Sequence, residues 1–223
     1  MNELPSAPRP ENLPPEPRWP GLLAVLTYGV LHFVLPAAFV VGPAWLTLVL
    51  VAMLLVPTAL THRLGKVELN EVFAYGALGV ITLSLLSSVL LLVRSLPDHR
   101  MQPTDLLRAA SILWVGNILV FASWYWRLDG GGPNERDRRG VHRDGAFLFP
   151  QMVLPPELQR QMGEDKWSPG FVDYLFLAFN TSTAFSPTDV PVLSRWAKVM
   201  MIVQSLISLA TVALLAARAV NII

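Results

Sequence analysis

Long apolar segments dominate this chain and restrict it to folds that a lipid bilayer can hold. Crossing the hydrocarbon core takes about 20 apolar residues. Of the 223 residues 53% are hydrophobic and 15% are charged, whereas a soluble domain carries about 25% charged residues. We therefore predict an all-α, multi-pass membrane protein of the cell (inner) membrane, with the lipid bilayer as its main partner. The five predicted transmembrane helices cover residues 19–41, 44–60, 72–93, 106–126 and 199–220.

The parts outside the spans suggest three regions. Residues 1–18 are predicted to be a disordered tail and not a cleavable signal peptide, because seven prolines and three glutamates stand among the first 20 residues. A docking motif for a partner is the alternative for this tail. Residues 19–96 form three N-terminal transmembrane helices, and residues 104–223 form a separate module built around the last two spans.

A long connection, residues 127–168, separates these last two spans. It contains Gly130-Gly131-Gly132 and a basic cluster, Arg136, Arg138, Arg139 and Arg143. A solvated loop with a glycine hinge is one interpretation, and contact with lipid headgroups is the other. Basic residues are balanced between the short loops, so these give no membrane orientation. The arginines of the long connection favour the cytoplasm for it, but long loops count weakly in this rule, and we expect this connection on the outer side.

A short apolar segment before the last span predicts a re-entrant element. Residues 169–185 are too few to cross the bilayer, and their end is polar. Irregular backbone at membrane depth is tolerated only inside protein or beside water. We therefore predict a re-entrant helix over 169–185, a filter-like turn over 186–189 and an inner helix over 194–221, with 106–126 as the outer helix. The candidate ion contacts are Thr181, Thr183, Ser186, Pro187, Thr188 and Asp189.

The chemistry of the turn argues against a ladder of backbone carbonyls. Pro187 fixes its own φ near −65° and biases Ser186 toward extended backbone, whereas a potassium filter uses glycines to aim successive carbonyls at a bare ion. The hydroxyl groups and Asp189 suit a hydrated cation instead. A structural role for Asp189, as a cap or a partner of Arg195, is the alternative.

The last span carries a polar stripe. Gln204, Ser208 and Thr211 recur at spacings of 4 and 3, which places them on one helix face. They line a pore or pack against another helix, where serine and threonine permit close approach. Asn117, in the span before, needs a buried hydrogen-bond partner, for which Gln204 and the re-entrant helix are the candidates.

Catalytic motifs are missing from the sequence. The four histidines lie in separate segments, no phosphate-binding glycine loop or Gly-x-Ser-x-Gly motif occurs, and there is no cysteine. We therefore predict that the protein is not an enzyme and holds no cofactor and no metal. A net charge of +1 gives no reason to expect nucleic acid.

Two resemblances add to this interpretation. The blocks Trp124-Tyr125-Trp126, Phe149-Pro150-Gln151, the run 183–189 and Gln204-Ser205 resemble an uncharacterised bacterial integral membrane protein family, a domain of unknown function. More distantly, residues 171–220 resemble the pore module of potassium channels, although Ser186-Pro187-Thr188 replaces the Gly-Tyr-Gly of the filter. This second resemblance implies a potassium-channel-like fold and a homo-oligomer, with a tetramer favoured.

Together these features predict a channel-like membrane protein with a degenerate pore loop that passes small ions. A non-conducting structural or accessory protein that retains the same fold is the alternative.

Overall fold

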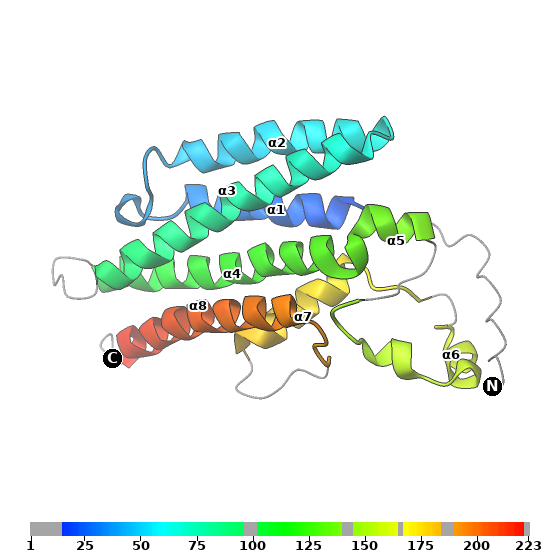
Figure 1. Ribbon diagram of the computed structural model, residues 1–223. Helices are drawn as coiled ribbons and strands as arrows, with labels where there is room; N and C mark the ends of the chain where they lie inside the picture. Colours follow the sequence, from blue (N-terminus) through cyan, green and yellow to red (C-terminus); the bar gives the residue numbers. More distant parts are fainter. Residues whose placement is uncertain (1–14, 96–101, 140–144, 165–166, 184–189, 221–223) are drawn as a thin grey trace.

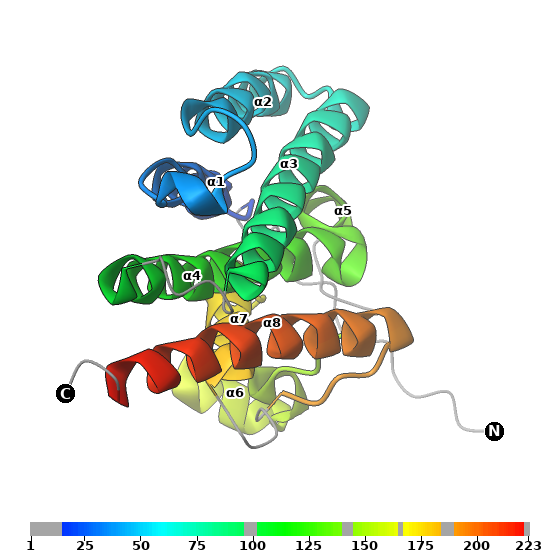
Figure 2. The same cartoon turned by 90° about the vertical axis from the view of Figure 1, so that its left-hand side faces the viewer.

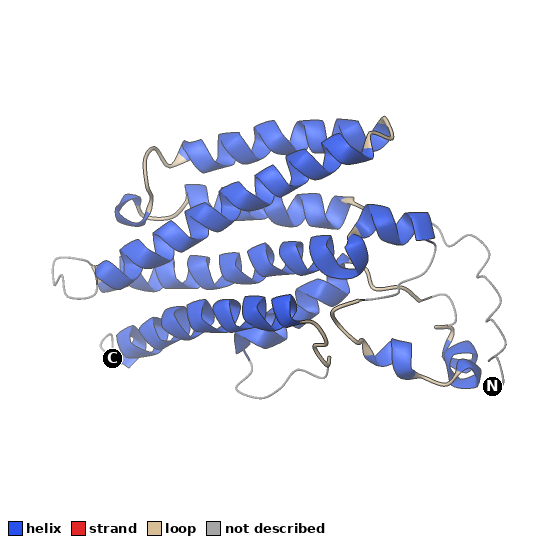
Figure 3. Ribbon diagram, in the orientation of Figure 1, coloured by secondary structure: helices blue, strands red, loops and turns tan. Residues whose placement is uncertain are grey.

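The computed structural model describes residues 15–95, 102–139, 145–164, 167–183 and 190–220. Their regular structure is helical, apart from one isolated antiparallel bridge between Phe147 and Val192 (Figure 3). The elements are α1 (Trp19–Phe33), η1 (Ala37–Phe39), α2 (Trp45–Arg63), α3 (Val67–Arg94), α4 (Pro103–Leu128), η2 (Asp129–Gly131), α5 (Pro133–Arg139), η3 (Pro150–Val153), α6 (Pro156–Met162), α7 (Phe171–Thr183) and α8 (Arg195–Val220).

Four of the helices are long and apolar enough to cross a membrane, namely α2, α3, α4 and α8. The all-helical class predicted from the sequence is thus confirmed for the described residues, and the four long apolar helices are compatible with a membrane protein. Helix α1 has 15 residues, or about 22 Å at 1.5 Å per residue, while the hydrocarbon core is about 30 Å thick. It ends at Phe33 because Pro36 lacks an amide hydrogen and disfavours helical backbone just before it. The first predicted span is therefore not one continuous helix, and a count of five spans stays a prediction.

Helix α4 is the centre of the bundle. Helices α1 and α3 pack on one side of it, and α7 and α8 pack on the other, while α2 covers α1 and α3 (Figure 2). Hydrogen bonds between side chains fix the first group: Tyr28 bonds Ser84 at 3.0 Å, His32 bonds Ser88 at 3.3 Å, and the Trp124 indole donates to Thr82 at 2.8 Å. Such contacts satisfy polar groups that lipid cannot.

The described part of the connection between α4 and α7 contains short helices and buried side chains. Gly130, Gly131 and Gly132 have φ of 59°, 82° and 85°, backbone that only glycine adopts without strain, and they turn the chain from α4 into α5. In α5 the side chain of Arg136 is buried, so the solvated-loop interpretation is wrong for this arginine. Arg138 and Arg139 bond Glu135 on the surface, and Arg143 lies outside the described residues.

Candidate functional site

The start of α7 and the segment that leads into α8 lie at the same end of the bundle. At this end the Tyr174 hydroxyl donates to Asp129, directly after α4, at 2.8 Å. The described chain resumes at Val190, and the amide of Leu193 donates to the carbonyl of Ala146 at 2.7 Å. The start of α7 and the segment before α8 therefore both lie at the end of the bundle where α4 finishes (Figure 1).

The described part of α7 ends beside the middle of α8. Its 13 residues extend about 20 Å, and Ser208, which lies about 20 Å along α8, donates to the carbonyl of Ser182 at 2.6 Å. A helix of this length cannot cross the hydrocarbon core. The geometry is compatible with a helix that enters the bundle and ends at mid-depth.

Gln204 joins the three helices α4, α7 and α8. Its amide nitrogen donates to the carbonyl of Ala178 at 2.7 Å and to the hydroxyl of Ser182 at 2.9 Å. Its amide oxygen accepts a hydrogen bond of 2.6 Å from the Tyr125 hydroxyl. Gln204 is 0% exposed, so these contacts saturate a side chain that is costly to bury unpaired.

Asn117 contacts the predicted partner. Its amide nitrogen donates to the backbone carbonyl of Gln204 at 3.0 Å, while its buried amide oxygen has no hydrogen-bond partner. Thr211 is also buried and bonds the carbonyls of Ile207 and Ser208 in its own helix. Within one copy of the chain the predicted polar stripe thus faces α4 and α7, as the packing interpretation describes.

A hollow of about 380 Å³ lies where the described part of α7 ends. Five hydroxyl-bearing residues line it: Thr181, Ser182, Thr183, Ser205 and Ser208. The other described lining residues are Trp114, Leu209 and Val212. Among the described residues, the indole nitrogen of Trp114 is buried without a hydrogen-bond partner, and leaving an N–H group unpaired in this way is costly.

Some of the predicted ion contacts belong to the described residues and others do not. Thr181 and Thr183 border the hollow, and each hydroxyl also donates to a carbonyl of its own helix. The filter-like residues Ser186, Pro187, Thr188 and Asp189 lie outside the described residues. The two threonines are therefore the part of the predicted loop whose surroundings are known.

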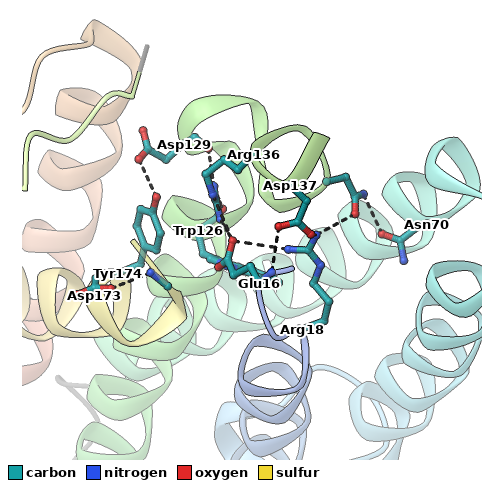
Figure 4. A network of polar contacts seen from close by, with 11 residues as sticks. Glu16, Arg18, Asn70, Trp126, Asp129, Arg136, Asp137, Asp173 and Tyr174 are labelled. Carbon is teal, nitrogen blue, oxygen red and sulfur yellow. Dashed lines mark hydrogen bonds and ion pairs between the residues drawn. The ribbon is translucent and has the colours of Figure 1, made fainter. Parts of the chain in front are cut away.

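A second polar site, at the end of the bundle where α4 finishes, was missed by the sequence interpretation (Figure 4). Arg136 is its centre: this side chain donates to the carbonyls of Trp126 and Asp129 at 3.0 and 2.6 Å and pairs with Glu16 at 2.8 Å. Its two carbonyl contacts cap the end of α4, where backbone groups have no partner within the helix. The site ties the residues before α1 to α4 and α5.

Arg18 extends this network toward α3. It pairs with Asp137 at 2.5 Å, and Asn134, which accepts from Arg18 at 3.4 Å, donates to Asn70 at 3.3 Å. Burial lowers the pKa of the Arg18 guanidinium, although the nearby carboxylates of Asp137 and Glu16 act in the opposite direction. Charged residues directly next to two predicted spans could have indicated this network in the sequence. They are Arg18 before the first span and Asp129 after the fourth.

The helices and their buried polar contacts are compatible with an integral membrane protein. Comparison of the chain with protein-family models, with curated proteins and with solved structures finds no match. The two family resemblances therefore stay predictions.

Proposed function

We propose that this chain is a channel-like integral membrane protein that passes small ions through a pore-like module of α4, α7 and α8. The supporting observation is the position of the hydroxyl-lined hollow, beside the middle of α8 and at the end of the described part of the short helix α7. Hydroxyl groups at this depth are costly against lipid, and they suit water and hydrated ions. The pore loop would be degenerate, without the Gly-Tyr-Gly of potassium channels.

The face of α8 that would line the ion path differs from the face that carries the predicted polar stripe. Ser205, Leu209 and Val212 border the hollow and follow one another at spacings of 4 and 3. Gln204 and Thr211 are not among the described lining residues of the hollow, and Ser208, which is, already donates its hydroxyl to the carbonyl of Ser182. The path would then run along the Ser205 face where copies of the chain meet, in a homo-oligomer for which a tetramer is favoured.

Ion flux into liposomes tests this proposal. The purified full chain is reconstituted, and the fluxes of potassium, sodium, chloride and protons are compared with those of empty liposomes. Ser205→Leu places an apolar side chain in the hollow and is expected to reduce the flux at least several-fold. Ser87→Leu is the matched control, because Ser87 lies on α3 and its hydroxyl donates to the carbonyl of Ser84 in its own helix. Absence of flux for every ion, together with a monomer in detergent, would contradict the proposal.

A non-conducting structural or accessory protein is the second candidate. It is favoured by the internal hydrogen bonds of Gln204 and Ser208, which use these polar side chains for contacts inside one copy of the chain. Two observations would support this candidate over the channel. The centre of an oligomer would be filled by side chains, and liposomes that contain the wild-type protein would be no more permeable to ions than empty liposomes.

A further inference from the structure

A separate cavity of about 140 Å³ lies at the end of the bundle, between the start of α1, the end of α2 and the end of α4. Its charged lining residues are Arg18, Arg63 and Arg127, and none of the described lining residues is acidic. The remaining lining consists of Leu22, Thr58, Ala59, His62, Asn70 and Trp126. A cavity with this lining attracts an anion.

Arg127 provides an unpaired donor in this lining. Arg127 is 6% exposed and its guanidinium lies over the ring of Trp126 at 5.3 Å, and its Nη1 has no hydrogen-bond partner among the described residues. A guanidinium stays protonated in proteins, so it cannot avoid the cost of burial by losing its charge. An anion in the cavity would remove this cost.

Arg18 faces the same cavity from the start of α1. Its Nη2 is occupied by Asp137, whereas its Nε is buried without a hydrogen-bond partner. Its Nη1 also lacks a hydrogen bond, although it lies 3.6 Å from a carboxylate oxygen of Glu16. The carboxylate of Glu71 borders the adjacent cavity on α3 and forms no ion pair with Arg127 among the described residues. Two arginines thus line one cavity, and each has buried N–H donors without a hydrogen-bond partner among the described residues.

We propose that this cavity, the arginine pocket, binds a phosphate group between Arg18 and Arg127. Guanidinium groups match the geometry of phosphate oxygens, and basic pockets at the ends of transmembrane helices hold phospholipid headgroups. The exposed Trp19, at the start of α1 and next to Arg18, is of the residue type that marks the level of lipid headgroups. An anionic phospholipid and free phosphate are the two sources of this group.

Thermal unfolding of the detergent-purified full chain tests the arginine pocket. Phosphatidylglycerol is compared with phosphatidylcholine, and sodium phosphate with sodium chloride at equal ionic strength. A ligand that binds only the folded chain raises its unfolding temperature by mass action. We expect a rise of several degrees with phosphatidylglycerol, and an additional rise with inorganic phosphate if the phosphate group alone suffices. No rise with either ligand would overturn the proposal.

Variants distinguish binding in the arginine pocket from nonspecific attraction of an anion to positive surface charge. Arg127→Gln is expected to weaken binding at least tenfold, and Arg63→Gln, at an exposed position, several-fold. Arg138→Gln removes one surface charge outside the arginine pocket and should bind as the wild type does. If Arg127→Gln does not fold, Arg63→Gln and Arg138→Gln still form a matched pair. Equal weakening in Arg63→Gln and Arg138→Gln would overturn the proposal, as would unchanged binding in Arg127→Gln.

Discussion

At the scale of single residues, Gln204 connects three helices through the hydrogen bonds of one side chain. Gln204→Leu removes two donated bonds and leaves the buried Tyr125 hydroxyl without its acceptor. We expect the free energy of unfolding to fall by about 1–3 kcal/mol. Thr211→Val is the control, because Thr211 bonds only carbonyls of its own helix. Equal stability of the two variants in denaturant titrations of the detergent-solubilised protein would refute this role for Gln204.

Gly132 is the residue on which the turn into α5 depends. A Cβ added here would lie 2.6 Å from the carbonyl oxygen of Arg127, at a φ of +85°. Gly132→Ala should therefore lower the free energy of unfolding by about 1–3 kcal/mol from backbone strain, with the clash adding to it. Gly163 also has a positive φ, +73°, but a Cβ added there meets no atom within 4 Å. Gly163→Ala therefore measures the backbone strain without the clash. Thermal unfolding of both variants measures the difference, which would be absent if the chain relaxed around Gly132.

At the scale of elements, α5 depends on one arginine. A helix of seven residues is too short to be stable by itself, and Arg136 anchors it to the end of α4 and to Glu16. Arg136→Gln should lower local stability by about 1.5–3 kcal/mol, because bonds of a charged group are lost. Hydrogen exchange of the amides in 129–139 should then accelerate by at least tenfold. Arg138→Gln, on the exposed side of α5, should leave the exchange unchanged.

The same elements show what could be predicted from the sequence. Helices α2, α3, α4 and α8 were predictable, because each contains an apolar run long enough to cross a bilayer. Helix α5 was not, because its polar residues are held by the contact of Arg136 with Glu16, which is distant in the sequence, and with the end of α4. The stripe Gln204, Ser208 and Thr211 was found by its periodicity, but periodicity does not tell which neighbour the stripe faces. The contact between Asn117 and Gln204 was anticipated because a buried amide needs a partner.

At the scale of the whole molecule, the fold gathers basic residues at one end. Arg18, Arg63, Lys66 and the arginines of α5 flank the spans at the end where α4 finishes, whereas Arg94 and Arg108 stand at the opposite end. Helix α5 follows α4 after a short turn, so its arginines lie within the distance over which basic residues set orientation. We therefore expect the end that carries α5 to face the cytoplasm. The helix α7 would then enter from the cytoplasmic side, opposite to the orientation implied by a potassium-channel frame.

Labelling of single cysteines in intact cells measures this orientation, since the chain has no cysteine of its own. Val41→Cys, after α1, and Met162→Cys, in α6, lie at opposite ends and are 65% and 60% exposed. A membrane-impermeant maleimide should label Val41→Cys in intact cells and Met162→Cys only after permeabilisation. The reverse pattern would place the basic end outside, against the positive-inside rule. It would also place the arginine pocket in the outer leaflet, so the labelling determines which leaflet can provide its phosphate group.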